Sequence, residues 1–236
     1  FDRIHFSYID EEPVLKDVNF EVQAGQTLAL VGATGAGKSS IINLILRFYN
    51  VDSGTILLDG KDIMQYNIQS LRSHIALVLQ DVFLFSDTIY KNIVLDKDIS
   101  IKEVRDAAKV IGVEGFIDQL PGGFHYDVRE RGVMLSAGQR QLIAFLRAFV
   151  CNPSVLILDE ATSSVDIQTE YLIKQSINKL TEGRTSIIIA HRLATIQNAD
   201  KILVMDQGQI VESGTHSDLL DQKGYYSRLF ELQFKS

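Results

Sequence analysis

A glycine-rich segment, GATGAGKSS, is the part of this sequence whose residue types and spacing indicate chemistry most directly. Glycines at positions 32 and 37 precede Lys38 and Ser39, which is the G-x-x-x-x-G-K-[ST] spacing of a nucleotide phosphate loop. Glycines let successive backbone N–H groups turn toward one anion, Lys38 reaches the β- and γ-phosphates, and Ser39 can ligate Mg²⁺. A strand-like run (TLALV) precedes the loop and a helix-like run (IINLILRF) follows it, so we favour a phosphate site over a chance glycine-rich turn. The residues expected to surround the phosphates are Gly32, Thr34, Gly35, Ala36, Gly37, Lys38, Ser39 and Ser40.

Two adjacent carboxylates, Asp159 and Glu160, follow a second apolar run, VLIL. An acidic residue that leaves a buried strand toward a phosphate loop is placed to hold Mg²⁺, usually through water. The next carboxylate can orient or deprotonate an attacking water molecule. The alternative is that the pair caps a helix that begins before ATSSVD, an interpretation that weakens once the phosphate loop is counted.

The segment LSAGQ, residues 135–139, places a hydroxyl, two small residues and an amide immediately before the helical stretch RQLIAFLRAF. Ser136 lies near the predicted helix start, and Ala137 and Gly138 leave backbone amides accessible, which favours a second anion site. Gln139 completes this segment. Taken by itself, a simple Ser136 helix cap is the commoner explanation. Two phosphate-binding loops in one chain are most economically explained by a nucleotide shared between two molecules.

Composition limits the class of protein. The 236 residues are 46% hydrophobic, enough for a substantial core, and the formal net charge of -7 is spread along the chain. No basic block or aromatic-interleaved Lys/Arg stripe occurs, so we expect no nucleic-acid partner. A single cysteine, Cys151, excludes a disulfide framework and favours the cytosol. No uncharged apolar run approaches the roughly 18 residues of a spanning helix, so we expect this chain alone to cross no membrane.

These functional residues need a sheet to position them, and short apolar runs rich in β-branched residues predict one. Near-continuous apolar runs of this length are typical of strands covered on both faces, hence of a mainly parallel sheet in an α/β fold. The strands expected in it are TLALVG at 27–32, VLILDE at 155–160, TSIIIAH at 185–191 and KILVMD at 201–206. An antiparallel β edge is expected from FDRIHFSY, VNFEV and TILLD.

Strand-like runs vanish between Gln80 and Cys151, where IKEVRDAAKVIGV and AGQRQLIAFLRAF show helical periodicity. We therefore predict an inserted helical subdomain at residues 81–151. Residues 1–80 and 152–236 are expected to form the core and the β edge. Together they make one domain, residues 1–236.

LSAGQ resembles the signature motif of the ATP-binding cassette (ABC) ATPases, whose usual form is LSGGQ. It lies between the phosphate loop and VLILDEATSSVD, in the order of that family, and the resemblance extends over essentially the whole chain. The resemblance implies a RecA-like P-loop NTPase core and an ATPase that uses ATP and Mg²⁺.

The resemblance also implies roles for residues at matching positions. Gln80 in VLQDVFLF is similar to the glutamine that senses Mg²⁺ and the γ-phosphate, and His191 in IIIAHR to the switch histidine that contacts the γ-phosphate. Tyr8 in HFSY matches the aromatic residue that stacks on adenine. The implied catalytic residues are Glu160, His191 and Gln80, the implied Mg²⁺ ligands are Ser39, Gln80 and Asp159, and the loop that crosses to the partner subunit contains Ser164 and Asp166.

Three longer segments, QDVFLFSDTIYKNI, VRERGVMLSAGQRQ and GQIVESGTHSDLL, are similar to exporter-type cassettes. Such cassettes are fused to or paired with transmembrane helices that carry lipids, drugs or peptides outward. The resemblance therefore implies a nucleotide-binding domain cut from a longer transporter and placed at the cytoplasmic face of the membrane. Its expected partners are a second nucleotide-binding domain, identical or a sister subunit, and a transmembrane domain contacted near residues 80–85. The transported substrate is not indicated.

Three features depart from the family pattern. Ala137 replaces the first signature glycine and adds a methyl near the expected γ-phosphate of the partner, and Arg129 replaces a glycine before ERG. GATGAGKSS replaces GPSGSGKST without loss of a functional position.

Three rival hypotheses differ from an ATPase that drives transport. A DNA-repair or translation cassette would carry basic surfaces or a long coiled coil, and a P-loop kinase would have no use for LSAGQ. A regulatory module that binds ATP without cleaving it would lack Glu160 or His191, and both are present. ATP hydrolysis is therefore the preferred hypothesis.

Overall fold

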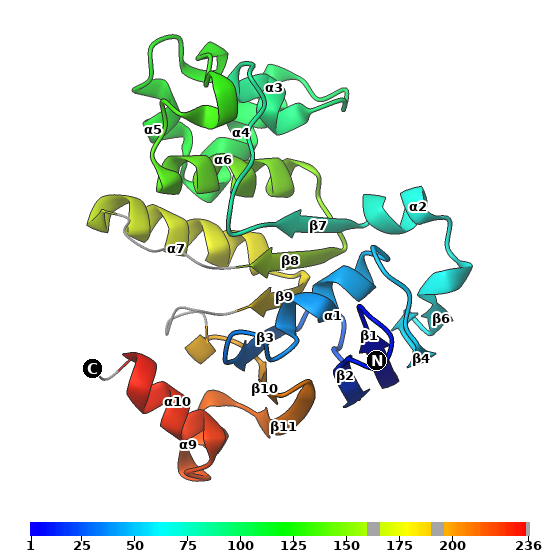
Figure 1. The fold of residues 1–236 in the computed structure, drawn as a ribbon. Helices are drawn as coiled ribbons and strands as arrows, with labels where there is room; N and C mark the ends of the chain where they lie inside the picture. Colours follow the sequence, from blue (N-terminus) through cyan, green and yellow to red (C-terminus); the bar gives the residue numbers. More distant parts are fainter. Residues whose placement is uncertain (160–165, 190–195, 235–236) are drawn as a thin grey trace. The chain divides into compact units, whose positions relative to one another are not determined.

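The structure, a computed structural model, describes residues 1–159, 166–189 and 196–234, and these fall into two compact units. Unit 1 comprises Phe1–Ile75 and Thr185–Ser236, and unit 2 comprises Ala76–Arg184. Figure 1 shows the ribbon coloured along the sequence. The predicted helical subdomain, residues 81–151, lies within the residues of unit 2, which also contains a strand on each side of it and a long helix that follows.

Unit 1 is built on four strands of a mainly parallel sheet. Their order is β11–β10–β3–β9, with bounds Gln209–Gly214, Lys201–Asp206, Thr27–Gly32 and Thr185–Ile189. Strand β3 pairs in parallel with β10 and β9, and only β11 runs antiparallel to its neighbour. Leu28, Ala29 and Leu30 of β3 are fully buried in succession, as expected for a strand covered on both faces. The predicted α/β fold with a mainly parallel sheet is confirmed.

Short antiparallel strands lie on both sides of β3 in the sequence. Strand β1 (Asp2–Ser7) pairs with β2 (Pro13–Val18) and with β4 (Ser53–Thr55), and the short β5 (Leu57–Leu58) pairs with β6 (Lys61–Asp62). The strand predicted at VNFEV, residues 18–22, is wrong, because the ladder ends at residue 18.

One further contact lies beyond the end of the ladder. The Phe20 ring stacks on Phe1 at 4.4 Å, and the two residues exchange backbone hydrogen bonds of 3.1 Å from the Phe20 N–H and 2.9 Å from the Phe1 amino group. The segment is therefore held at this one residue, and no strand continues through it.

The helices of unit 1 within the described residues are α1 (Lys38–Ile45), α2 (Ile68–Ser73), α9 (His216–Asp221) and α10 (Tyr225–Phe234), with the 3₁₀ turn η1 (Ile63–Gln65) before α2. Helix α1 contacts β3, and α9 and α10 contact β11. Helix α10 starts where Glu212 of β11 accepts hydrogen bonds from the backbone N–H groups of Tyr225 and Tyr226. A carboxylate at a helix start is favourable because the orphan N–H groups there carry partial positive charge.

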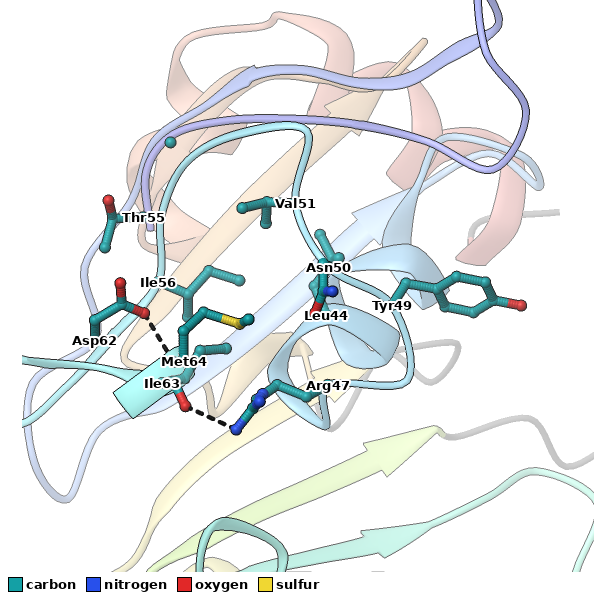
Figure 2. Close-up of a pocket in the computed structure, with 11 residues that line it drawn as sticks. Leu44, Arg47, Tyr49, Asn50, Val51, Thr55, Ile56, Asp62, Ile63 and Met64 are labelled. Atoms are coloured by element: carbon teal, nitrogen blue, oxygen red, sulfur yellow. Dashed lines mark hydrogen bonds between the residues drawn. The ribbon is translucent and has the colours of Figure 1, made fainter. Parts of the chain in front are cut away.

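A small pocket lies between the end of α1 and η1 (Figure 2). Arg47 closes one side of it by donating to the carbonyl groups of Ile63 at 3.2 Å and Tyr66 at 2.8 Å. The side chain of Tyr49 is directed away from the pocket (Figure 2). None of the residues predicted to bind nucleotide lines this pocket, so it is separate from the candidate site.

Unit 2 is mainly helical. Its helices are α3 (Ile89–Val94), α4 (Ile101–Ile111), α5 (Glu114–Asp118), α6 (Ala137–Val150) and α7 (Ile167–Thr181), with 3₁₀ turns η2 (Gly123–His125) and η3 (Glu130–Gly132). Helix α6 packs against α3, α4 and α7. The helices predicted from IKEVRDAAKVIGV and AGQRQLIAFLRAF are confirmed as α4 and α6. Strands β7 (Ile75–Val78) and β8 (Val155–Asp159) are neighbours in the sheet, and their arrows point the same way in Figure 1.

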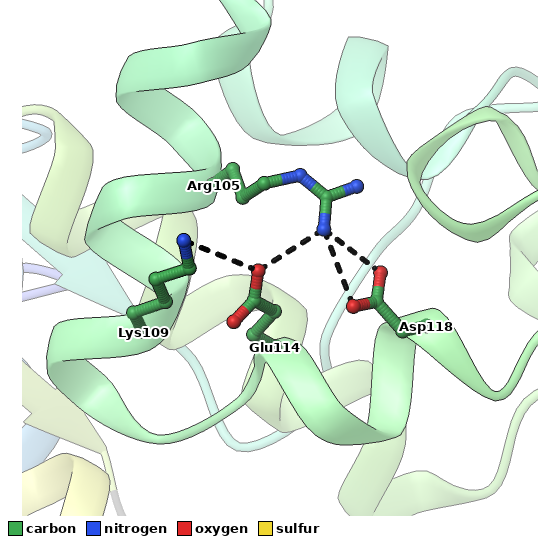
Figure 3. A network of polar contacts seen from close by, with 4 residues as sticks. All are labelled: Arg105, Lys109, Glu114 and Asp118. Atoms are coloured by element: carbon green, nitrogen blue, oxygen red, sulfur yellow. Dashed lines mark hydrogen bonds and ion pairs between the residues drawn. The ribbon is translucent and has the colours of Figure 1, made fainter.

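A polar network joins α4 to α5 (Figure 3). Arg105 donates to Glu114 at 3.0 Å and to Asp118 at 3.1 Å, and Lys109 lies 3.8 Å from the same Glu114 carboxylate. The side chains of this network are exposed or half-buried, so its contribution to the stability of the fold is small.

No helix within residues 1–159, 166–189 and 196–234 combines the length and apolar character that a bilayer crossing requires.

Candidate functional site

The predicted phosphate loop connects β3 to α1 in unit 1. Gly32 leaves the strand with φ 156°, and a Cβ atom there would collide with the backbone carbonyl of Met205 on β10. Gly37 has φ 102° and occupies the N-cap of α1 without a side-chain hydrogen bond to the helix. The loop therefore depends on glycine at both ends, and its cap places no side chain over the first turn of α1.

Lys38 is the first residue of α1 and turns back into the loop. Its Nζ donates to the carbonyl oxygens of Gly32 at 2.7 Å and Ala33 at 2.9 Å. The residue is only 8% exposed, so the ammonium group is held at the loop rather than in bulk water. Thr34 and Gly35 are exposed at the tip of the loop, Ala36 is buried, and the Ser39 hydroxyl group belongs to an exposed residue.

The loop has the features that a nucleotide phosphate site requires. A buried ammonium group, glycines that bring the backbone close, and an uncapped helix start are the features that recognise such an anion. The residues present therefore fit the group.

Tyr8 lies beside the same helix. Its hydroxyl lies 3.1 Å from Ser40 Oγ and accepts a hydrogen bond of 2.9 Å from Asn43 Nδ2. The Tyr8 ring meets Phe6 and Tyr49 edge to face, with centroid distances of 4.7 Å and 4.9 Å. Unit 1 therefore brings the predicted adenine residue to the helix that begins the phosphate site.

The sequence interpretation missed Asn43 and Tyr49. A signal for Asn43 was available, because residues three apart share a helix face and Ser40 and Asn43 are three apart on α1. No pattern in the sequence signals Tyr49.

The LSAGQ segment forms the start of α6 in unit 2. Ser136 is the N-cap, with its Oγ accepting from the Gln139 N–H at 3.2 Å, while Gln139 Oε1 accepts from the Ser136 N–H at 3.0 Å. The simple cap, raised above as the commoner explanation, is therefore present. Ala137 is exposed and Gly138 is buried, and neither backbone N–H is part of this reciprocal pair of bonds.

The loop before α6 is strained and tightly held. Arg129 has φ 61° and Gly132 has φ 68°, and a Cβ at Gly132 would lie 2.8 Å from Leu84 Cδ1. Arg140 donates to the Leu135 carbonyl at 2.7 Å and thereby ties the loop to α6. The position of the helix start is thus fixed by its surroundings as well as by its cap.

The remaining predicted residues of unit 2 lie at strand and helix ends. Gln80 is exposed two residues after β7, and the half-buried Asp159 is the last residue of β8, so they follow the same ends of neighbouring strands. Asp166 is the N-cap of α7, where its carboxylate accepts from the Thr169 N–H at 2.9 Å. Hydrogen bonding to Thr169 holds the pKa of this carboxyl below its usual value.

Three predicted residues, Glu160, Ser164 and His191, lie outside the described residues. Unit 1 brings Tyr8 and the phosphate loop together, and unit 2 contains Gln80, Asp159 and the LSAGQ segment.

Comparison with known proteins agrees with this geometry. The family described as "ABC transporter" matches residues 15–163. The chain is 47% identical over 234 residues to the "Probable multidrug resistance ABC transporter ATP-binding/permease protein YheH" of Bacillus subtilis (strain 168), covering 99% of this chain and 35% of that protein. It is 52% identical over 237 residues to the "ATP-dependent lipid A-core flippase" of Idiomarina loihiensis, covering 99% of this chain and 41% of that protein.

A solved structure is also similar. The "Structure of a bacterial Atm1-family ABC exporter with ATP bound" aligns with a TM-score of 0.92 and 44% sequence identity, over 99% of this chain and 41% of that chain. This chain thus spans 35% to 41% of the length of these three proteins.

Proposed function

This chain belongs to the ABC transporter family, and on that basis we propose that it is the ATP-binding and ATP-hydrolysing domain of an exporter. The phosphate loop carries the proposal, because Lys38 is held at the carbonyl groups of Gly32 and Ala33, where phosphate oxygens are expected to replace them. The related proteins named above as an ATP-binding/permease protein and as an ATP-bound exporter support it.

The residues of unit 1 bind the nucleotide. The backbone amides of the loop and the start of α1 receive the phosphates, and Lys38 exchanges its carbonyl acceptors for β- and γ-phosphate oxygens. The Tyr8 ring stacks on adenine, since it is 44% exposed and an aromatic face suits a purine.

The family resemblance assigns Mg²⁺ to Ser39, Gln80 and Asp159, which would supply hydroxyl, amide and carboxylate oxygens of the kind this ion prefers. When bound, Mg²⁺ neutralises charge on the transferring phosphoryl group. Glu160 takes a proton from the attacking water, and His191 contacts the γ-phosphate. Both roles rest on the family resemblance.

The LSAGQ segment serves a second copy of the domain. The Ser136 cap uses the Gln139 N–H, whereas the amides of Ala137 and Gly138 are outside that pair, which supports a role in binding the nucleotide of a partner. In the resulting head-to-tail dimer, identical or between sister subunits, ATP binding favours closure and hydrolysis favours opening. Asp166 lies at the loop expected to cross to the partner.

An exposed apolar surface in unit 2 supports docking to a transmembrane domain. Leu79, Phe83 and Phe85 are 51%, 53% and 54% exposed, and the two Phe rings contact edge to face at 5.1 Å. Asn92 is 1% exposed and holds the Phe85 backbone from both sides, accepting from its N–H at 2.8 Å and donating to its carbonyl at 2.9 Å. A rigid backbone that presents aromatic rings to solvent is typical of a protein interaction site.

We infer that the complete protein also contains a transmembrane domain. The ATP-binding domain formed by the present chain would then lie at the cytoplasmic face of the membrane. The relatives named for multidrug and lipid A-core transport support an exporter, and the transported substrate of this protein is left unassigned.

ATP hydrolysis by the purified chain, measured as phosphate release with and without Mg²⁺, tests the proposal. Mg²⁺-dependent release that Glu160→Gln abolishes is the expected result. Release that persists unchanged in Glu160→Gln would contradict the assignment of the base.

A further inference from the structure

The hydroxyl group of Tyr8 is held by two side chains of α1. Asn43 Nδ2 can only donate, so the Tyr8 oxygen accepts this bond of 2.9 Å, and the phenolic O–H can donate to Ser40 Oγ at 3.1 Å. Ser40 is 5% exposed and its bond to Tyr8 is partly buried, whereas Asn43 is half-buried and its bond to Tyr8 is exposed to water. These two bonds join Tyr8 to residues that follow it by 32 and 35 positions in the sequence.

The rest of the Tyr8 ring is also constrained. Phe6 meets it at an interplanar angle of 80° and Tyr49 at 86°, so aromatic neighbours restrict rotation about the side-chain bonds. Tyr49 is free to do this because its side chain points away from the pocket of Figure 2. The ring therefore has a fixed plane while 44% of the residue stays exposed.

We propose that Asn43 is a positioning residue for nucleotide binding, which acts by fixing the plane of the Tyr8 ring before the purine base arrives. Helix α1 begins at Lys38 and carries both Ser40 and Asn43, so one rigid element sets the separation between the base platform and the phosphate loop. We call the two hydrogen bonds of the Tyr8 hydroxyl group with Ser40 and Asn43 the clamp. This inference rests on the proposed function and deepens it, since it assigns the clamp to recognition of the base rather than of the phosphates.

Preorganisation is the physical basis of the effect. A tyrosine ring that is free to rotate loses side-chain freedom when a base stacks on it, and that loss weakens binding. The two hydrogen bonds of the clamp impose the same ordering during folding. Loss of the clamp should therefore weaken ADP binding by about 2- to 10-fold.

Asn43→Leu, which keeps the branched shape of the side chain but removes the donor, tests the proposal. We expect its Kd for ADP, measured by calorimetry on the 236-residue chain, to rise by that factor. The affinity for pyrophosphate, measured by displacement of ADP, should not change, because pyrophosphate has no base. Asn178→Leu on α7 is the matched control and should bind ADP as the wild type does.

Tyr8→Phe keeps the stacking ring but removes the clamped oxygen, so it should weaken ADP binding to the same extent. Adding Asn43→Leu to Tyr8→Phe should cause no further loss, because the two substitutions break one interaction. If Asn43→Leu does not fold, the affinities of Tyr8→Phe for ADP and for pyrophosphate test the proposal in its place.

The other outcomes each overturn the proposal. Unchanged ADP affinity in both variants, with ADP bound by the wild type, removes the clamp and leaves the proposed function intact. Equal losses for ADP and pyrophosphate, or a second full loss in the double variant, place Asn43 in the phosphate loop instead. A wild-type chain that binds neither ADP nor ATP overturns both this inference and the proposed function.

Discussion

Replacement of Lys38 by alanine removes the one side-chain charge at the phosphate loop, and the structure gives the size of the expected effect. Lys38 already donates hydrogen bonds to the carbonyl groups of Gly32 and Ala33. ATP binding therefore exchanges existing hydrogen bonds rather than adding new ones. Only the difference between a phosphate and a carbonyl acceptor contributes to affinity.

A hydrogen bond to a charged group is worth about 1.5–3 kcal/mol, and we expect the exchange of carbonyl for phosphate acceptors to add the equivalent of one such bond. This corresponds to a rise in the Kd for ATP of about 10- to 150-fold. Lys38 reaches the β- and γ-phosphates, so AMP binding should change far less.

Calorimetric titration of Lys38→Ala with ATP and AMP is the assay, and Lys38→Met is the matched control. Lys38 is 8% exposed, so methionine keeps the buried stem and should show the same loss of ATP affinity with a smaller loss of thermal stability. An ATP affinity within twofold of wild type in both variants, or an equal loss for AMP, would refute the role of the ammonium group.

Three further predictions concern other parts of the molecule. Ala137→Gly should raise the ATPase rate or leave it unchanged, because it removes an exposed methyl at the start of α6; a fall in phosphate release with the fold preserved would contradict this. Glu160→Gln should form an ATP-dependent dimer in light scattering at high protein concentration, with ADP as the control, and added Ser136→Arg should abolish it; a dimer that survives Ser136→Arg would exclude LSAGQ from the contact. Burial lowers the pKa of His216 below its ordinary value of 6.5, so the folded state binds fewer protons than the unfolded state, and the free energy of unfolding should fall as the pH drops through 6.5. Urea unfolding at pH above and below 6.5 should show a smaller fall in the free energy of unfolding for His216→Gln than for the wild type. An equal fall in both proteins would exclude His216 as the source of this pH dependence.

The parallel sheet could be predicted because burial of a strand on both faces leaves a direct mark in the sequence. The run TLALVG gives the bounds of β3 without error. The run VNFEV failed because Phe20 is buried by one stacked ring, and a short apolar alternation cannot tell a paired strand from a single buried contact. Local patterns therefore identify an element when its burial is continuous.

Site residues followed the same rule. The phosphate loop is contiguous in the sequence, so its residues and spacing were visible at once. The clamp on Tyr8 joins residues from β1 and α1, and such a contact exists only after the chain folds. The family resemblance predicted that Tyr8 stacks on adenine. The structure adds the hydrogen bonds that would orient its ring before the nucleotide binds.

The Ser136 cap appeared at first to compete with a nucleotide role for LSAGQ, and the atoms involved show that it does not. The cap uses Ser136 Oγ, the Gln139 N–H and the Gln139 amide oxygen. An anion at the helix start would be met by the N–H groups of Ala137 and Gly138, which are earlier in the first turn. Capping orders that turn and so fixes the direction of these two donors. A helix cap and an anion site are therefore compatible uses of one segment, and only a substitution that blocks approach without removing the amides, such as Ser136→Arg, can separate them.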